Sequence, residues 1–173
     1  MENIKKQSNL YENVKVVVKI NNRDNNFISD IVPTHSGIEN LNTVDKCVWW
    51  STNVKPNFDK ISKILDTNKK IEMIIIDNKN KHNYYAEIID IKNADKDEVI
   101  SSPDLSITPE YYKDKKFKTW YKLQNISPLD KTSIDLNKLV LRYHVDCDNN
   151  IIPLPEIINS RPSFMYVIDK DLF

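Results

Sequence analysis

The stretch Cys47–Thr52, Cys-Val-Trp-Trp-Ser-Thr, holds two of the three tryptophans of the chain side by side. Its β-branched and aromatic residues predict a strand. Neighbouring side chains of a strand point to opposite faces of the sheet, so Trp49 and Trp50 cannot both enter one core from the same face. One ring packs inward, and the other needs a second layer or a binding pocket. Either both rings are structural, or one is the wall of a pocket for a flat ligand.

Outward from this strand, short apolar runs and one amphipathic segment predict an α+β fold. Apolar residues from Phe58 to Leu65 recur at helical spacing, which predicts a helix over 57–66. Most connections are too short for helical crossovers, so we expect a mostly antiparallel sheet, curved into a partly closed barrel with two or three short helices outside. The predicted strands are 14–20, 47–51, 71–76, 84–91, 117–123, 140–145 and 164–168, with a further short apolar run at 27–32 and weak helical patterns at 36–44 and 134–139.

The length of 173 residues suits one domain over residues 14–173, preceded by a polar, frayed N-terminal stretch at 1–13. The first residues lack the apolar centre of a signal peptide, and no apolar run approaches the length of a membrane span. We therefore expect a soluble, cytoplasmic domain that has no membrane partner.

Charge and composition exclude several classes of site. Lys and Arg together equal Asp and Glu at 25 each, which argues against strong non-specific nucleic-acid binding but leaves room for a local basic patch. The single glycine, Gly37, rules out a P-loop and a dinucleotide fingerprint. Two distant cysteines and three scattered histidines form no metal-binding spacing. We expect no catalytic residue, no metal and no cofactor.

The aromatic residues outside the Trp pair are more informative. Tyr111 and Tyr112 lie in a long polar segment, Trp120 alternates with lysines in a predicted strand, and Arg161 precedes the last strand. Aromatic rings beside basic side chains are what a base-stacking, phosphate-tracking site requires. The alternative is that these rings belong to the core, as most aromatic residues in strands do.

Taken in order, these motifs resemble the YTH domains. Residues 48–52 followed by Asn57 and a Phe58-x-x-Ile61 helix resemble their W-x-S-T…N-x-x-L pattern. The same order continues through 16–21, Ala86-Glu87, 117–121 and the Asn-Ser-Arg at 159–161, and residues 160–165 are also similar to the end of EVE domains. Both families belong to the PUA-like superfamily of barrel folds, and the similarity spans about 14–168.

The resemblance implies a set of binding residues. YTH domains hold N6-methyladenine in an aromatic cage, and in this chain Trp49 would be the first wall. The backbone of Trp50 would contact the base edge, with Ser51 in the same cage, and Asn21 would hydrogen-bond the base. The second wall would come from the 105–112 segment, which carries Leu105, Tyr111 and Tyr112 where the family has a tryptophan. Lys19 and Arg161 would face phosphates.

The implied function is non-enzymatic recognition of a modified nucleobase, with N6-methyladenine as the leading candidate, in DNA or single-stranded RNA. In a duplex the base would first have to be flipped out. The domain would act alone or as the targeting domain of a restriction-type system with a motor or nuclease subunit. The alternatives are a protein-interaction module and a nucleotide-processing enzyme on the same fold.

Overall fold

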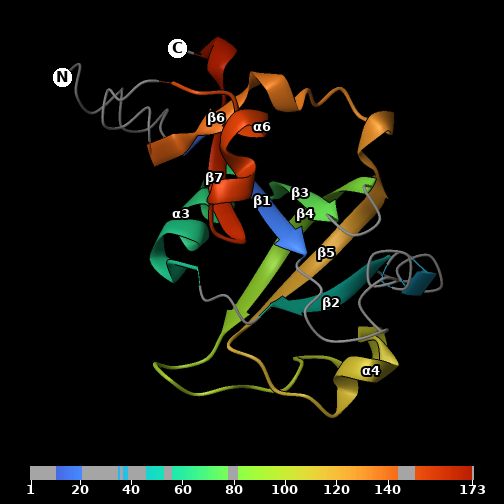
Figure 1. The fold of residues 1–173 in the computed structure, drawn as a ribbon. Coiled ribbons are helices and arrows are strands. Elements are labelled where there is room, and N and C mark those ends of the chain that lie inside the picture. The colour runs from blue at the N-terminus through green and yellow to red at the C-terminus, as the bar shows by residue number, and fades with distance from the viewer. Residues whose placement is uncertain are drawn as a thin grey trace.

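A computed structural model describes residues 11–20, 35, 37–38, 46–52, 56–77, 82–143 and 151–172, and its centre is one seven-stranded sheet (Figure 1). The strand order is β2-β5-β4-β3-β1-β7-β6. The strands are β1 (Lys15–Ile20), β2 (Cys47–Thr52), β3 (Ile71–Asp77), β4 (His82–Asn93), β5 (Thr119–Pro128), β6 (Leu139–Leu141) and β7 (Phe164–Asp169). The α-helices are α3 (Phe58–Asn68), α4 (Glu110–Lys113) and α6 (Leu154–Ile157), and the 3-10 turns are η2 (Leu105–Ile107), η3 (Leu129–Lys131), η4 (Leu136–Lys138), η5 (Ile158–Ser160) and η6 (Lys170–Leu172).

The α+β class and the mostly antiparallel pairing are confirmed, but the predicted barrel is wrong. Within the described residues, the edge strands β2 and β6 lie at opposite ends of the strand order, and the sheet stays open. The β1–β3 pair is parallel, because the chain between these strands is long enough to carry β2 and α3. This pairing leaves β7 and the three-residue β6 to extend the sheet beyond β1, away from β2.

Two apolar layers cover the faces of the sheet. Val16 and Val18 of β1 point into the layer that includes α3, and Val17 between them points into the layer that includes α6. Helix α3 packs against β3 and β4, and α6 lies beside β6 (Figure 1). Burial on both faces explains why β1 and β3 read as near-continuous apolar runs rather than as alternating ones.

Helix α3 confirms the helix predicted at 57–66 and shows why it starts and stops where it does. The Asn57 side chain accepts a hydrogen bond from the Lys60 amide at 3.0 Å, which caps the first turn. The helix ends at Lys69, whose φ of 65° is left-handed. Ile61 and Ile64 are fully buried, whereas Phe58, the first residue of the predicted apolar face, is 38% exposed. Phe58 sits in the first turn of the helix, ahead of the buried pair.

We expect Asn57→Ala to lower the free energy of unfolding by about 1 kcal/mol, because the substitution removes the side-chain cap of α3. Urea denaturation measures the change. Asn57→Asp is the matched control, since aspartate caps equally well and its charge suits a helix N-terminus. An alanine variant as stable as the wild type would show that this cap does not stabilise the fold.

Three of the predicted segments cannot be compared with the structure. The described residues do not include 1–10, 27–32 or most of 36–44. The strand expected at 140–145 ends at Leu141, and Arg142 and Tyr143 are helical. Helix α6 was not predicted, although Pro155 in its first turn is a favourable start. No helix in the described ranges is long and apolar enough to cross a membrane.

Candidate functional site

Both tryptophans of β2 are buried. Trp49 is 4% exposed and Trp50 is 3% exposed, and they belong to one apolar cluster. The strand alternation holds, since Trp49 lies opposite Lys122 and Trp50 lies opposite Tyr121 in β5. Both sides of this strand pair are nevertheless covered. The partly exposed ring that the cage interpretation expects at Trp49 is therefore not seen.

The segment between β4 and β5 explains this burial. It carries η2 and α4 and lies beside β2 and β5 (Figure 1). Trp120 of β5 is fully buried, and its indole N–H donates to the Ile100 carbonyl of this segment at 2.9 Å. The Trp120 ring also packs edge-on against Tyr112 and Phe117, with ring centroids 5.9 and 5.4 Å apart. The segment that was predicted to supply the second cage wall is thus a packed layer of the domain.

An aromatic cluster lies where α4 meets β2 and β5. The centroid of the His35 ring lies 6.3 Å from that of Trp50 and 5.7 Å from that of Tyr112. Tyr111 and Tyr112 are 4.6 Å apart, and Trp50 is 6.3 Å from Tyr121. We define the aromatic cluster as His35, Trp50, Tyr111, Tyr112, Phe117, Trp120 and Tyr121.

Trp50 Nε1 and Ser51 Oγ are buried, and neither has a hydrogen bond of normal geometry within the described part of the chain. Both lie near the Tyr112 hydroxyl. Burial raises the pKa of Tyr112 to about 12, and the Ser51 and Trp50 side chains act in the opposite direction by stabilising its phenolate. An unsatisfied buried polar group costs about 1–3 kcal/mol, so these two atoms are candidate contacts for a ligand.

A second polar contact lies at the edge of the cluster. The Tyr111 hydroxyl lies 3.1 Å from Nδ1 of His35. Burial, with a smaller effect of Tyr112, raises the pKa of Tyr111 well above its usual range. Tyr111 therefore stays protonated at neutral pH and can donate a hydrogen bond.

The structure brings together four of the predicted base-binding residues: Trp50, Ser51, Tyr111 and Tyr112. Leu105 is 49% exposed instead, and Asn21 lies outside the described residues. Sequence reasoning assigned no role to His35, because a single histidine in a polar stretch gives no pattern. Only the fold shows that it contacts three rings of the cluster.

The two predicted phosphate contacts lie together, but Lys19 has a structural role. Lys19 is 8% exposed, and its ammonium donates to the carbonyls of Ile158 at 2.8 Å and Arg161 at 2.5 Å. Its backbone N–H donates to Ser163 at 2.8 Å. Lys19 therefore binds the turn that leads into β7, and two backbone carbonyls accept hydrogen bonds from its ammonium group.

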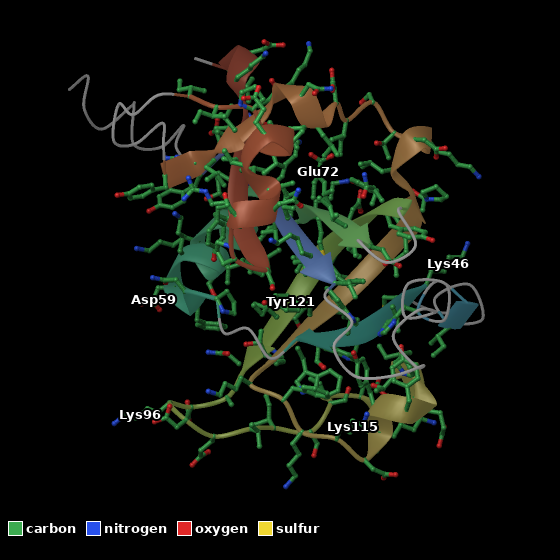
Figure 2. The ribbon with its side chains drawn as sticks, in the orientation of Figure 1. Lys46, Asp59, Glu72, Lys96, Lys115 and Tyr121 are labelled. Atoms are coloured by element: carbon green, nitrogen blue, oxygen red, sulfur yellow. The ribbon has the colours of Figure 1, made fainter. Side chains whose placement is uncertain are left out.

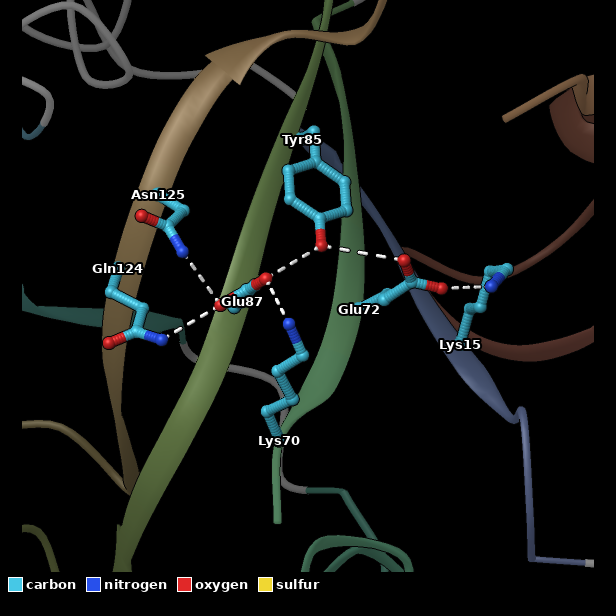
Figure 3. Close-up of polar contacts among 7 residues, drawn as sticks. All are labelled: Lys15, Lys70, Glu72, Tyr85, Glu87, Gln124 and Asn125. Atoms are coloured by element: carbon cyan, nitrogen blue, oxygen red, sulfur yellow. Dashed lines mark hydrogen bonds and ion pairs between the residues drawn. The ribbon is translucent and has the colours of Figure 1, made fainter. Parts of the chain in front are cut away.

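A buried carboxylate network crosses β3, β4 and β5 (Figure 3). Glu87 accepts hydrogen bonds from Lys70, Gln124, Asn125 and Tyr85 at 2.5, 2.8, 2.9 and 3.0 Å. Burial acts to raise the pKa of Glu87, but these four donors outweigh it and hold the pKa at about 2. Four donors hold this carboxylate in its ionised form, so its role is to stabilise the sheet and not to act as a general acid or base.

Tyr85 links this carboxylate to a second one. Its hydroxyl also lies 3.4 Å from Glu72, which pairs with Lys15. Burial and the two carboxylates raise the pKa of Tyr85 well above its usual range. Tyr85 is therefore a neutral bridge between two anions.

A cleft of about 720 Å³ opens at the other end of β5, between the start of β4 and η3. Among the described residues, its lining includes one carboxylate, Asp130, and neither lysine nor arginine. The lining residues are Asn83, Tyr84, Pro128, Leu129, Asp130, Thr132 and Ile134.

The chain belongs to the Pua-like family, whose model matches residues 19–149. The match covers most of the chain and takes in β2, β5, α4 and the aromatic residues between them. It does not assign the chain to the narrower YTH or EVE families. No curated protein and no solved structure shows a significant match.

Proposed function

We propose that this Pua-like domain is a non-enzymatic reader of a modified nucleobase, with N6-methyladenine as the leading candidate, in DNA or single-stranded RNA. The observation that supports it best is the pair of unsatisfied buried atoms, Trp50 Nε1 and Ser51 Oγ, inside a cluster of aromatic rings. The implied partner is nucleic acid. The domain would bind it either alone or as part of a system with a motor or nuclease subunit. In this proposal Trp50, rather than Trp49, contacts the base, and it does so through its indole N–H.

The chemistry of the two side chains fits the edge of a base. The indole N–H can only donate, and a serine hydroxyl can both donate and accept. N6-methyladenine presents a ring nitrogen that accepts beside an exocyclic N–H that donates. A base placed against Trp50 and Ser51 would satisfy both groups and remove the cost of leaving them unpaired. The added methyl group would bury apolar surface among the rings, worth about 0.8 kcal/mol.

Entry of a base requires the Tyr112 ring to move away from Trp50, because these side chains fill the site and Tyr112 is 8% exposed. Helix α4 is suited to this movement. It has only four residues, and no side chain caps its N-terminus. Local opening of such a turn costs less than unfolding the sheet. The base would then lie beside the Tyr112 ring, with its edge toward Trp50 Nε1 and Ser51 Oγ.

The first test separates binding from folding. We expect Ser51→Ala to weaken binding of a methylated oligonucleotide roughly 5- to 10-fold, the value of one hydrogen bond. The same substitution should change the melting temperature little, because the Ser51 hydroxyl has no hydrogen bond of normal geometry within the described residues and interacts only with the nearby Tyr112 hydroxyl. Fluorescence anisotropy with methylated and unmodified single strands, both DNA and RNA, measures the affinity.

Ser62→Ala, on α3, is the matched control and should change neither property. Equal affinity of the wild type for methylated and unmodified strands would contradict the proposed function. A Ser51→Ala variant that binds as well as the wild type would remove Ser51 from the site.

A further inference from the structure

The segment between β4 and β5 separates its charges along the chain. Residues 94–110 carry five acidic side chains and one lysine, whereas residues 113–118 carry four lysines and one aspartate. A basic stretch therefore follows α4 directly, although the whole chain has no net charge. The residues are Asp95, Asp97, Glu98, Asp104, Glu110 and Lys96 in the acidic part, and Lys113, Lys115, Lys116, Lys118 and Asp114 in the basic part.

Three of these lysines have no carboxylate partner among the described residues. Lys113 pairs with Glu110 at 2.8 Å, but no ion pair involves Lys115, Lys116 or Lys118. We refer to these three residues as the lysine patch. Unpaired surface lysines are common, but these three lie directly beside the aromatic cluster.

Backbone hydrogen bonds and one ring contact connect the lysine patch to the aromatic cluster. Phe117 exchanges two backbone hydrogen bonds with Ile100, at 2.9 and 2.8 Å, and its ring lies 5.1 Å from that of Tyr112. The Lys115 amide donates to the Tyr112 carbonyl at 3.0 Å, and the Lys118 carbonyl accepts from Ala94 at 2.9 Å. The backbone that carries the lysine patch is thus anchored to Ile100 and Ala94, next to the aromatic cluster.

The side chains of the patch are placed for a ligand outside the cluster. Phe117 points toward Tyr112 and Trp120, whereas Lys115 and Lys116 just before it are exposed to solvent. Lys118 is partly buried, as a lysine stem lying along the surface would be. Figure 2 shows Lys115 beside α4, at the border of the molecule.

We propose that the phosphates flanking the recognised base bind the lysine patch, rather than Lys19, whose ammonium is held by backbone carbonyls. This inference rests on the proposed function, because the base in the aromatic cluster fixes where the strand runs. Three phosphate contacts on a single strand correspond to a slope of about −2 in log K against log[salt], since each contributes roughly −0.7.

The test is the variant Lys115→Gln/Lys116→Gln/Lys118→Gln, compared with Lys63→Gln/Lys69→Gln/Lys131→Gln. The control removes the same charge from exposed lysines on α3, its cap and η3. Binding of a single-stranded methylated oligonucleotide, DNA and RNA in separate titrations, is followed from low to high salt. We expect the patch variant to reduce the salt slope by about 2 and the control to leave it within half a unit of the wild type.

A second probe, N6-methyladenosine without phosphates, distinguishes failure of this inference from failure of the proposed function. We expect the nucleoside to shift the same NMR resonances in the patch variant as in the wild type. An unchanged oligonucleotide salt slope in the patch variant, with the nucleoside still bound, would overturn the lysine patch and leave the base site standing. A wild-type protein that binds neither methylated probe in preference to its unmodified form would overturn both.

Discussion

Replacing Trp120 with alanine is expected to lower the free energy of unfolding by about 3–5 kcal/mol, the usual cost of truncating a fully buried tryptophan. Its ring packs against Tyr112 and Phe117, and its indole N–H holds the Ile100 carbonyl. The substitution would leave a cavity between β5 and the 94–118 segment, and it would remove one of the two hydrogen bonds that the Ile100 carbonyl accepts. Denaturation by guanidinium, followed by circular dichroism, measures the loss.

Two controls show whether the loss comes from this contact. Trp120→Phe keeps most of the ring and removes the hydrogen bond, so we expect it to cost less than the alanine variant. Val99→Ala lies next to Ile100 in the same segment but truncates a side chain that is 47% exposed, so its effect should be small. If Trp120→Ala were as stable as Val99→Ala, the 94–118 segment would not be a packed layer of the domain.

Replacing Glu87 with glutamine is expected to cost about 3 kcal/mol at neutral pH. The pKa of Glu87 is about 2 in the folded protein against 4.5 ordinarily, and each pKa unit corresponds to about 1.4 kcal/mol. A neutral amide cannot accept all the hydrogen bonds that Lys70, Gln124 and the other donors provide. Urea denaturation at a series of pH values measures the change.

The stabilisation by Glu87 should decrease as the pH falls. Because folding lowers the pKa of Glu87, its contribution is complete above pH 4.5 and is lost as the pH falls from 4.5 to about 2. The difference in stability between the wild type and Glu87→Gln should therefore shrink across that range. Glu110→Gln removes an exposed carboxylate paired with Lys113 and should have little effect at any pH. A constant difference between the two proteins would show that Glu87 is not the group that titrates.

The order of apolar and polar residues within short segments was enough to predict several strands and one helix. β1, β2, β3 and α3 follow from apolar periodicity and from the cap at Asn57, which act within a few residues. The parallel β1–β3 pair and the open sheet were not predictable in this way. They depend on which strands meet across 50 residues of intervening chain, and periodicity does not encode that choice.

The site was predicted in part for the same reason. The proximity of Trp50 and Ser51 to Tyr111 and Tyr112 followed from a family resemblance in the order of motifs. The assignment of one tryptophan to a pocket assumed that one face of β2 is uncovered, and the 94–118 segment covers it. The Glu87 network joins side chains from β4, β5 and the turn before β3, and no single stretch of sequence shows this pairing.

The indole N–H resonances of the three tryptophans test the central claim most directly. In a ¹H–¹⁵N spectrum, assigned with Trp→Phe variants, we expect titration with a methylated single strand to move the Trp50 resonance to saturation. The Trp120 resonance should move little, because its N–H donates to Ile100. The unmodified strand should move the Trp50 resonance only at much higher concentration. A Trp50 resonance that stays in place while the methylated strand binds would contradict a base site at Trp50 and Ser51.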